Sequence, residues 1–276
     1  MEDTSQRPFL ARHEFLIRRL HSLSGLVPVG AYLCVHLVTN ASVLNGPESF
    51  QKQVDTIHML GRALPIVEWV FIFLPLLFHA VVGVMMIRGM VPNTGSYPYK
   101  NNIRYTLQRA TGMIAFAFIV WHVIQMHHLF GAPFKDVRVF PLPNGGAVFD
   151  PQAATSTAAT ALQASLAVFI LYLVGVLACV YHLANGLWTM GITWGIWTTA
   201  AAQRRANWLA LAFGIVLGVV GVSAGVGMFT TDINEARAFE QAQAQQREES
   251  ERRKQENLER ETAAAGEGRE TASTAP

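Results

Sequence analysis

Five long apolar segments, separated by shorter polar stretches, form the dominant pattern of this chain. Each is long enough to cross the hydrocarbon core of a bilayer as a helix, which takes about 20 residues. We expect the spans at about residues 21–44, 64–87, 110–130, 161–188 and 208–229. The pattern therefore predicts an all-α integral membrane protein, in which residues 1–229 form a five-transmembrane-helix bundle.

Two of the polar stretches carry patterns of their own. Between the first two spans, weak helical amphipathicity (Phe50, Val54, Ile57, Gly61) predicts a segment that lies along the membrane surface. After the last span, residues 230–276 are rich in Glu, Arg, Gln and Ala. We expect this charged tail to be a solvated helix that frays into disorder.

The composition agrees with a membrane protein, since 51% of the residues are hydrophobic and 14% are charged. No Asp, Glu, Lys or Arg occurs between Asp150 and Arg204. The net charge of +2 is too small to indicate nucleic-acid binding. The first apolar segment has no small-residue cleavage pattern, so we expect it to remain as a helix.

The Lys and Arg residues beside the spans indicate the orientation, because cytoplasmic loops carry an excess of them. A cytoplasmic N-terminus places most of these residues inside: Arg7, Arg12, Arg18, Arg19, Arg88, Lys100, Arg104, Arg109, Arg204 and Arg205. Few then lie outside: Lys52, Arg62, Lys135 and Arg138. We therefore expect the N-terminus in the cytoplasm and the C-terminus outside.

Four of the apolar segments carry one histidine each: His36, His79, His122 and His182. An imidazole at bilayer depth needs a partner, a cavity or a metal, because the hydrocarbon offers no hydrogen bonds. A single such histidine is most simply explained by an interhelical hydrogen bond. Four of them, in four separate spans, point to a common cause.

The depths of the histidines sort them into two pairs, using a helical rise of about 1.5 Å per residue. His36 and His122 belong to the outer half of the membrane, and His79 and His182 to the inner half. The two layers are separated by roughly 10 Å. Two sites with two histidines each fit this arrangement better than one site with four.

Two imidazoles from facing helices are the usual axial ligands of b-type heme. Zinc would need third and fourth ligands, and the spans offer none at these depths. Cys34 and Cys179 lie within apolar runs, and the absence of a CxxCH motif excludes covalently attached heme. Gly83 and Gly186, each four residues after a histidine, would leave room for a flat macrocycle. The sequence therefore predicts two b-type hemes.

Three polar residues could assist the inner heme. His21, Ser22 and Arg109 lie at the cytoplasmic ends of spans, where they could contact the propionates of the inner heme, or could be interfacial anchors and topology charges.

Glu68 is the one carboxylate within the expected spans. It precedes His79 by eleven residues, which on a regular helix places the two side chains within about 20° of the same face. It could protonate a quinone beside the outer heme, with His127 and His128 continuing a proton path outward, or it could be an interfacial, hydrated residue.

The chain contains no flavin, nicotinamide or iron-sulfur motif. An electron donor must therefore be a soluble partner that docks on the inner face, and a lipophilic acceptor such as a quinone would serve the other end.

Four stretches together resemble a known family: RRLHSLSGLVPVGAYLCVHLVTN, FIFLPLLFHAVVGV, LQRATGMIAFAFIVWH and YLVGVLACVYHLANGLWTMGITWG. They resemble the cytochrome b558 membrane subunit of succinate dehydrogenases, in the diheme, five-helix class. The resemblance covers about residues 14–200 and contains the four histidines in order. It does not cover the tail.

The resemblance implies that His79 and His182 bind the heme nearer an iron-sulfur subunit, and that His36 and His122 bind the distal heme. It further implies a flavoprotein subunit that oxidises succinate, menaquinone as the usual acceptor, and a place in the bacterial cytoplasmic membrane. No succinate-oxidising site is expected in this chain. Related fumarate reductases carry a glutamate where this chain has Val180, so proton transfer through that position is not expected.

Two alternatives remain open from the sequence. A fumarate reductase anchor would carry electrons in the reverse direction, and the direction depends on redox potentials. A transporter or non-redox anchor with hydrogen-bonded histidines would need charged or helix-broken sites at the midplane, and the sequence offers only Pro75.

Overall fold

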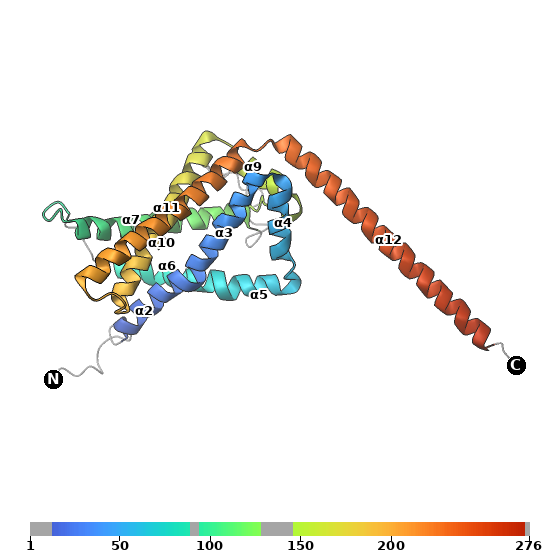
Figure 1. Cartoon of the computed structure of the whole chain (residues 1–276), viewed down its shortest axis with the longest axis horizontal. Coiled ribbons are helices and arrows are strands. Elements are labelled where there is room, and N and C mark those ends of the chain that lie inside the picture. Colours follow the sequence, from blue (N-terminus) through green and yellow to red (C-terminus); the bar gives the residue numbers. More distant parts are fainter. Residues whose placement is uncertain (1–12, 89–93, 128–145, 274–276) are drawn as a thin grey trace. The chain divides into compact units, whose positions relative to one another are not determined.

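The computed structural model describes residues 13–88, 94–127 and 146–273, with side chains up to residue 262. Within these residues the chain is helical, with no strand (Figure 1). It forms two compact units, Met1–Thr231 and Asp232–Pro276. The first unit contains all the apolar segments, and the second consists of one helix, α12 (Ile233–Ser273).

Five helical segments in the first unit are long and apolar enough to cross a membrane: Glu14–Asn45, Gly61–Ile87, Lys100–Met126, Leu166–Thr193 and Ala200–Thr230. The predicted number of spans and the all-α class are confirmed. The boundaries are less accurate, and the expected end of the third span, Phe130, lies outside the described residues. The fourth span begins at Leu166, because the Ser165 side chain accepts a hydrogen bond from the Val168 N–H and caps a new helix there.

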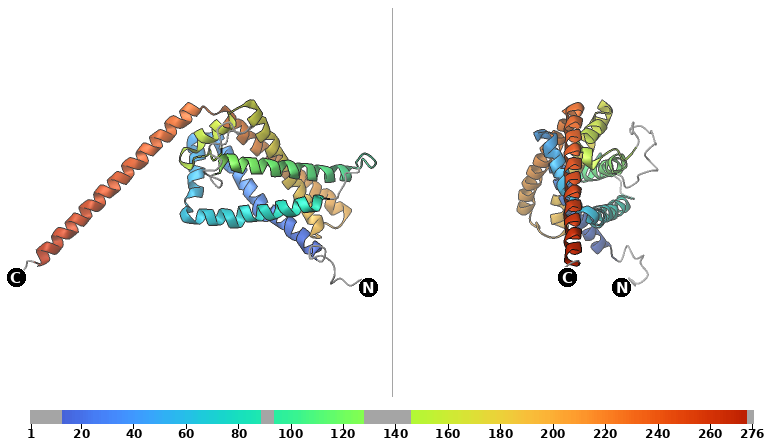
Figure 2. Two further views of the ribbon diagram at one scale, coloured as in Figure 1. Left: turned by 180° about the vertical axis from the view of Figure 1, so that it is seen from behind. Right: turned by 90° about the vertical axis from the view of Figure 1, so that its right-hand side faces the viewer.

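The first two spans change their helical winding along their length, and the other three are single α-helices. Figure 2 shows the bundle from two further sides. The first consists of α2 (Glu14–Ser24), the π-helix η2 (Gly25–Gly30), α3 (Ala31–Ala41) and the 3₁₀-helix η3 (Ser42–Asn45). The second consists of the 3₁₀-helix η4 (Gly61–Ala63), α5 (Leu64–Glu68), the π-helix η5 (Trp69–Phe73) and α6 (Leu74–Ile87). Pro28 lies inside η2 and Pro75 follows η5 closely. Since proline has no N–H for the usual helical bond, each accounts for the local change of winding.

Helix α10 (Leu166–Thr193) lies at the centre of the bundle, packed against α7 (Lys100–Met126) and α11 (Ala200–Thr230). Buried Val180, Leu183 and Leu217 join α10 to α11 in one apolar cluster with Leu37 of α3. Many large apolar side chains are instead exposed on the outside of the bundle. Such a surface is expected of helices that face lipid.

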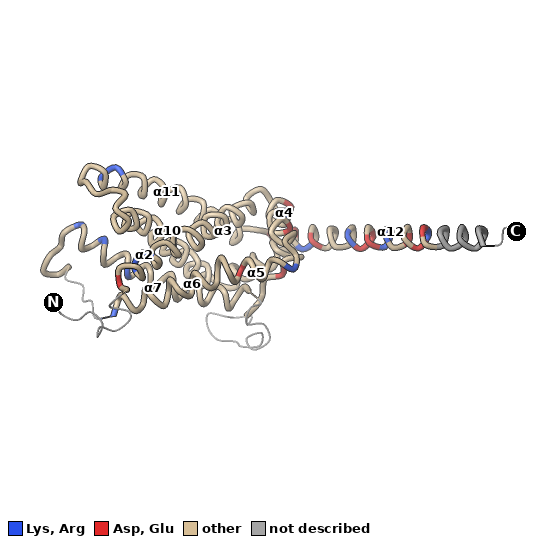
Figure 3. The backbone as a smooth tube through the Cα atoms, turned by 90° about the horizontal axis from the view of Figure 1, so that it is seen from below, with Lys and Arg blue, Asp and Glu red and all other residues tan. Residues whose placement is uncertain are grey.

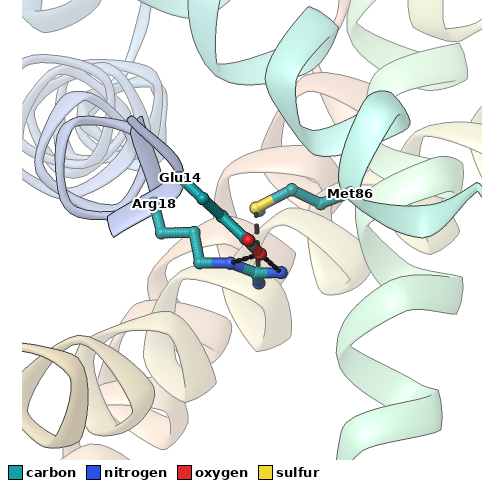
Figure 4. Close-up of polar contacts among 3 residues, drawn as sticks. All are labelled: Glu14, Arg18 and Met86. Atoms are coloured by element: carbon teal, nitrogen blue, oxygen red, sulfur yellow. Dashed lines mark hydrogen bonds and ion pairs between the residues drawn. The ribbon is translucent and has the colours of Figure 1, made fainter. Parts of the chain in front are cut away.

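A polar contact between the first two spans lies at the beginning of α2 (Figure 4). Arg18 donates to Glu14 one turn earlier in α2, with N···O distances of 2.9 and 2.6 Å. Its third nitrogen lies 3.8 Å from the sulfur of Met86 in α6. The ion pair is exposed, so it contributes at most about 1 kcal/mol and mainly orients Arg18.

Helix α4 (Pro47–His58) occupies the stretch predicted to lie along the membrane surface, and its place relative to the membrane stays a prediction. Phe50 and Val54 are buried in a cluster with Ala154 and Ala158 of α9 (Ala154–Leu162). Gln51 is fully buried; it donates to the Pro151 carbonyl at 2.7 Å and accepts from the Ala154 N–H at 3.2 Å. The small side chains of α9 let Phe50 and Val54 of α4 pack against protein, whereas Ile57 is 39% exposed.

The charged residues are distributed as the sequence indicated (Figure 3). Acidic and basic residues are interspersed along α12 up to residue 262, whereas the spans of the first unit are nearly free of them. The tail is helical through Ser273, and its fraying into disorder stays a prediction.

Candidate functional site

The rings of the four histidines of the spans, each partly buried, lie in two facing pairs. His79 of α6 and His182 of α10 have ring centroids 6.0 Å apart, with an interplanar angle of 86°. His36 of α3 and His122 of α7 have centroids 5.8 Å apart, with an angle of 74°. These are the same pairs that the depths along the spans predict.

The spacing within each pair is close to that of two imidazoles that share one metal. A metal–imidazole bond is about 2.0 Å long and a ring nitrogen lies about 1.2 Å from its centroid, so such centroids are at most about 6.4 Å apart, slightly more than the 5.8 and 6.0 Å found here. Among the described residues there is no group of three or more His, Cys, Asp or Glu side chains that could hold a metal. The donor set therefore fits a metal whose remaining ligands come from a macrocycle, as in heme.

His79 is fixed by the main chain of α2. Its Nδ1 lies 2.8 Å from the carbonyl oxygen of His21, to which it donates as the Nδ1–H tautomer. A Cβ at Gly25 would lie 2.2 Å from Cε1 of His79, so only glycine leaves room for this ring. The hydrogen bond at Nδ1 leaves Nε2 of His79 available for a metal.

His182 is fixed in the same way by α7. Its Nδ1 donates to the carbonyl oxygen of Gln108 at 3.0 Å, and the Gln108 side chain donates to the His182 carbonyl at 3.1 Å. A Cβ at Gly112 would lie 2.8 Å from Cε1 of His182. Nε2 is again the nitrogen left for a metal.

The second pair is fixed by side chains. Nδ1 of His122 lies 3.3 Å from the hydroxyl of Tyr172, which donates to Oε1 of Gln125 at 2.8 Å. Both Tyr172 and Gln125 are buried. The ring of Tyr32 stacks on His36, with centroids 5.5 Å apart.

The residues expected at heme propionates have the following surroundings. The ring of His21 stacks on His79, with centroids 4.0 Å apart, and its Nδ1 is buried without a hydrogen-bond partner among the described residues. Ser22 accepts a bond from the Trp194 indole at 3.0 Å, and the Arg109 guanidinium lies 3.7 Å from the Tyr105 ring centroid. Their role at propionates stays a prediction.

The two glycines expected to leave room for a macrocycle face polar side chains. A Cβ at Gly83 would lie 3.2 Å from Cε1 of His21, and one at Gly186 would lie 3.8 Å from Nε2 of Gln108. The space beside these glycines is therefore next to residues that support the His79–His182 pair.

Glu68 ends α5, and its Oε1 lies 3.5 Å from Nε2 of His127, just after α7. The ring of Phe73 packs edge-on against His127, and Tyr32 interacts electrostatically with Glu68. The predicted shared face with His79 does not follow from a regular helix, because the π-helix η5 lies between them. His128 lies outside the described residues.

The polar residues that surround the histidines were not predicted from the sequence. Most lie three or four positions from a histidine in the same span, which puts them on its face: Asn185 after His182, Gln125 after His122, and Tyr32 before His36. Gln108 and Tyr172 have no such relation, because they reach a histidine on another helix.

A five-helix membrane unit with facing histidine pairs in its interior is the architecture of a cytochrome b membrane anchor. No family model matches the chain. It is 36% identical over 211 residues to the succinate dehydrogenase cytochrome b558 subunit of Bacillus subtilis (strain 168), an alignment that covers 76% of this chain and 95% of that protein. The chain therefore belongs to the family of succinate dehydrogenase cytochrome b558 subunits, the membrane-anchor cytochromes b of that enzyme.

Proposed function

We propose that this chain binds two b-type hemes, one between His79 and His182 and the other between His36 and His122, and carries electrons between them. The two facing pairs, each with a spacing close to that of two imidazoles sharing one metal, are the observation that supports this function. When bound, the heme irons supply one-electron redox chemistry.

The chain's own residues would hold and orient these groups. The carbonyls of His21 and Gln108 fix the tautomer and ring direction of His79 and His182, and the hydroxyl of Tyr172 does the same for His122. The surrounding apolar spans exclude water, which keeps the electron path insulated from solvent.

The partners follow from the family and the orientation. The name of the relative supports the other subunits of a succinate dehydrogenase as partners. We propose that these are an iron-sulfur and a flavoprotein subunit on the cytoplasmic face, beside the His79–His182 heme. The excess of Lys and Arg supports a cytoplasmic N-terminus in a bacterial cytoplasmic membrane. Arg7, Arg12, Lys135 and Arg138 of that count lie outside the described residues. Succinate oxidation is favoured over fumarate reduction by the same name.

Menaquinone would accept the electrons beside the His36–His122 heme. Glu68 and His127, 3.5 Å apart, form an acid–base pair that could deliver protons to this quinone. Glu68 also interacts electrostatically with Tyr32, whose ring stacks on His36. The side chains of Glu68 and His127 are 24% and 37% exposed, so protons could reach this pair from outside the bundle.

The test is to count the hemes and assign each to its ligands. A pyridine hemochrome assay should find two hemes per chain. In redox titrations, His79→Ala and His182→Ala should lose one component, and His36→Ala and His122→Ala the other. His58→Ala is the control, because His58 lies outside both pairs and bonds only the Val54 carbonyl of its own helix in the structure. One heme per chain, or the same component lost in His79→Ala and His36→Ala, would contradict the proposal.

A further inference from the structure

A chain of hydrogen bonds connects His182 to a guanidinium group. The side chain of Gln108, which bonds the His182 carbonyl, accepts a bond at 2.6 Å from Nδ2 of Asn185. The oxygen of Asn185 in turn accepts from Nε of Arg104. A fixed positive charge is thereby joined to one histidine through two amide side chains.

Arg104 is held in place on several sides. Its NH1 donates to Oδ1 of Asn207 in α11 at 2.7 Å, and its guanidinium lies 3.8 Å from the ring centroid of Trp188 in α10. Asn185, between Arg104 and Gln108, is 5% exposed. Residues of three helices, α7, α10 and α11, thus fix the direction of the Arg104 guanidinium, a charge that from the sequence alone indicates only topology.

A cation fixed in this position has a predictable electrostatic effect. Oxidised heme iron carries one positive charge more than reduced iron, so a nearby cation disfavours the oxidised form and raises the reduction potential. Arg104 is partly buried, so solvent screens its charge less than it would screen a charge at a fully solvated surface. By contrast, the group that His122 contacts is the neutral hydroxyl of Tyr172.

We propose that Arg104, acting through Asn185 and Gln108, is a positioning residue that raises the reduction potential of the His79–His182 heme relative to the other heme. The inference rests on the proposed function, since it needs a heme at that pair. A higher potential there would make this heme the better acceptor for electrons arriving from the iron-sulfur subunit.

The experiment is a redox titration of both hemes in membranes that contain the assembled complex. Arg104→Gln removes the charge and keeps a polar side chain. At a fixed solution potential near the midpoint, the ratio of reduced to oxidised His79–His182 heme should fall about tenfold, which is about 59 mV for a one-electron couple. The other heme should stay at its wild-type potential.

Three further variants separate charge from structure. Arg104→Lys keeps the charge and should stay near the wild-type potential. Asn185→Ala breaks the connection but keeps the charge, and should give a smaller change in the same direction. Arg205→Gln removes an exposed charge two residues before Asn207 and should change the ratio by less than about twofold.

The outcomes distinguish this inference from the proposed function. Absence of the heme in the wild-type protein would contradict the proposed function itself. Two hemes with an unchanged potential in Arg104→Gln, an equal change in both hemes, or a change in Arg104→Lys as large as in Arg104→Gln would overturn the role of the Arg104 charge. If the Arg104→Gln protein does not accumulate, the potentials of the His79–His182 heme in Arg104→Lys and Asn185→Ala test the proposal instead. A wild-type potential of this heme in Asn185→Ala counts against the proposal.

Discussion

The two histidine pairs have similar spacing but are held by different parts of the chain. In the His79–His182 pair, both Nδ1 atoms bond to main-chain carbonyls, those of His21 and Gln108. In the other pair, Nδ1 of His122 bonds to a side-chain hydroxyl, that of Tyr172. A carbonyl acceptor persists through any side-chain substitution, whereas a hydroxyl is lost with a single one. The first pair therefore depends on backbone position and the second on side-chain identity.

The polar neighbours of the pairs also differ in charge. The His79–His182 pair is connected to Arg104 through amides, whereas the His36–His122 pair lies near the Glu68–His127 contact by way of Tyr32. A fixed cation suits the tuning of a potential, and a carboxylate beside an imidazole suits proton transfer. The difference suggests that one end of the electron path is adapted to receive electrons and the other to couple them to protons.

The largest expected effect comes from the glycines that the backbone-held pair requires. Gly25→Ala and Gly112→Ala place a methyl group 2.2 and 2.8 Å from the rings of His79 and His182. Since each ring is tied to a carbonyl, it cannot move away and keep its ligand geometry. Both variants should lose the His79–His182 heme and keep the other, as measured by hemochrome content and redox titration.

A matched control is Gly218→Ala, whose new methyl would lie 3.9 Å from Val180 in ordinary contact. It should retain both hemes. Loss of both hemes in Gly112→Ala, or of the His36–His122 heme alone, would mean that the two pairs are not held independently.

Much of this arrangement could be predicted from the sequence, because hydrocarbon thickness fixes the length of a span and helical rise fixes depth along it. The number of spans and the pairing of His79 with His182 followed from those two lengths. Whether Glu68 and His79 share a helix face could not be derived in this way, since an eleven-residue count assumes regular α-helical winding and η5 is a π-helix. The burial of α4 was also missed, because the amphipathic pattern around Phe50 does not distinguish lipid from the small residues of α9.

The contacts of Arg104 could not be predicted for a related reason. The positive-inside rule treats each Lys and Arg as a charge near the membrane surface. Whether a long side chain faces water or turns toward Asn185 and Asn207 depends on how three helices pack, and no local pattern records that.

The next largest effect is expected from Glu68, near the His36–His122 pair. Glu68→Gln keeps the shape of the side chain and removes the proton-transfer group. Quinone reduction should slow by about 100-fold, a typical contribution of a general acid or base. Both heme spectra and succinate oxidation with an artificial dye acceptor should be preserved. Glu48→Gln, in the first turn of α4, is the control with a carboxylate outside the spans. Wild-type quinone reduction in Glu68→Gln with full heme content would place protonation elsewhere.

The smallest effect tests the side-chain support of the second pair directly. Tyr172→Phe keeps the ring that packs against His122 and removes the hydroxyl between His122 and Gln125. Loss of such a supporting bond typically lowers metal affinity by about tenfold to hundredfold, so the His36–His122 heme should be lost first when the protein is diluted in detergent.

The same substitution has a second, signed consequence. A hydrogen-bond acceptor at Nδ1–H makes the imidazole a more basic ligand and favours oxidised iron, so its removal should raise the potential of this heme alone. Tyr32→Phe is the control, because Tyr32 also lies against a histidine of this pair but contacts it through the face of its ring. It should leave the potential unchanged. A potential in Tyr172→Phe equal to wild type, or a change in the His79–His182 heme, would remove the distinction between backbone and side-chain support.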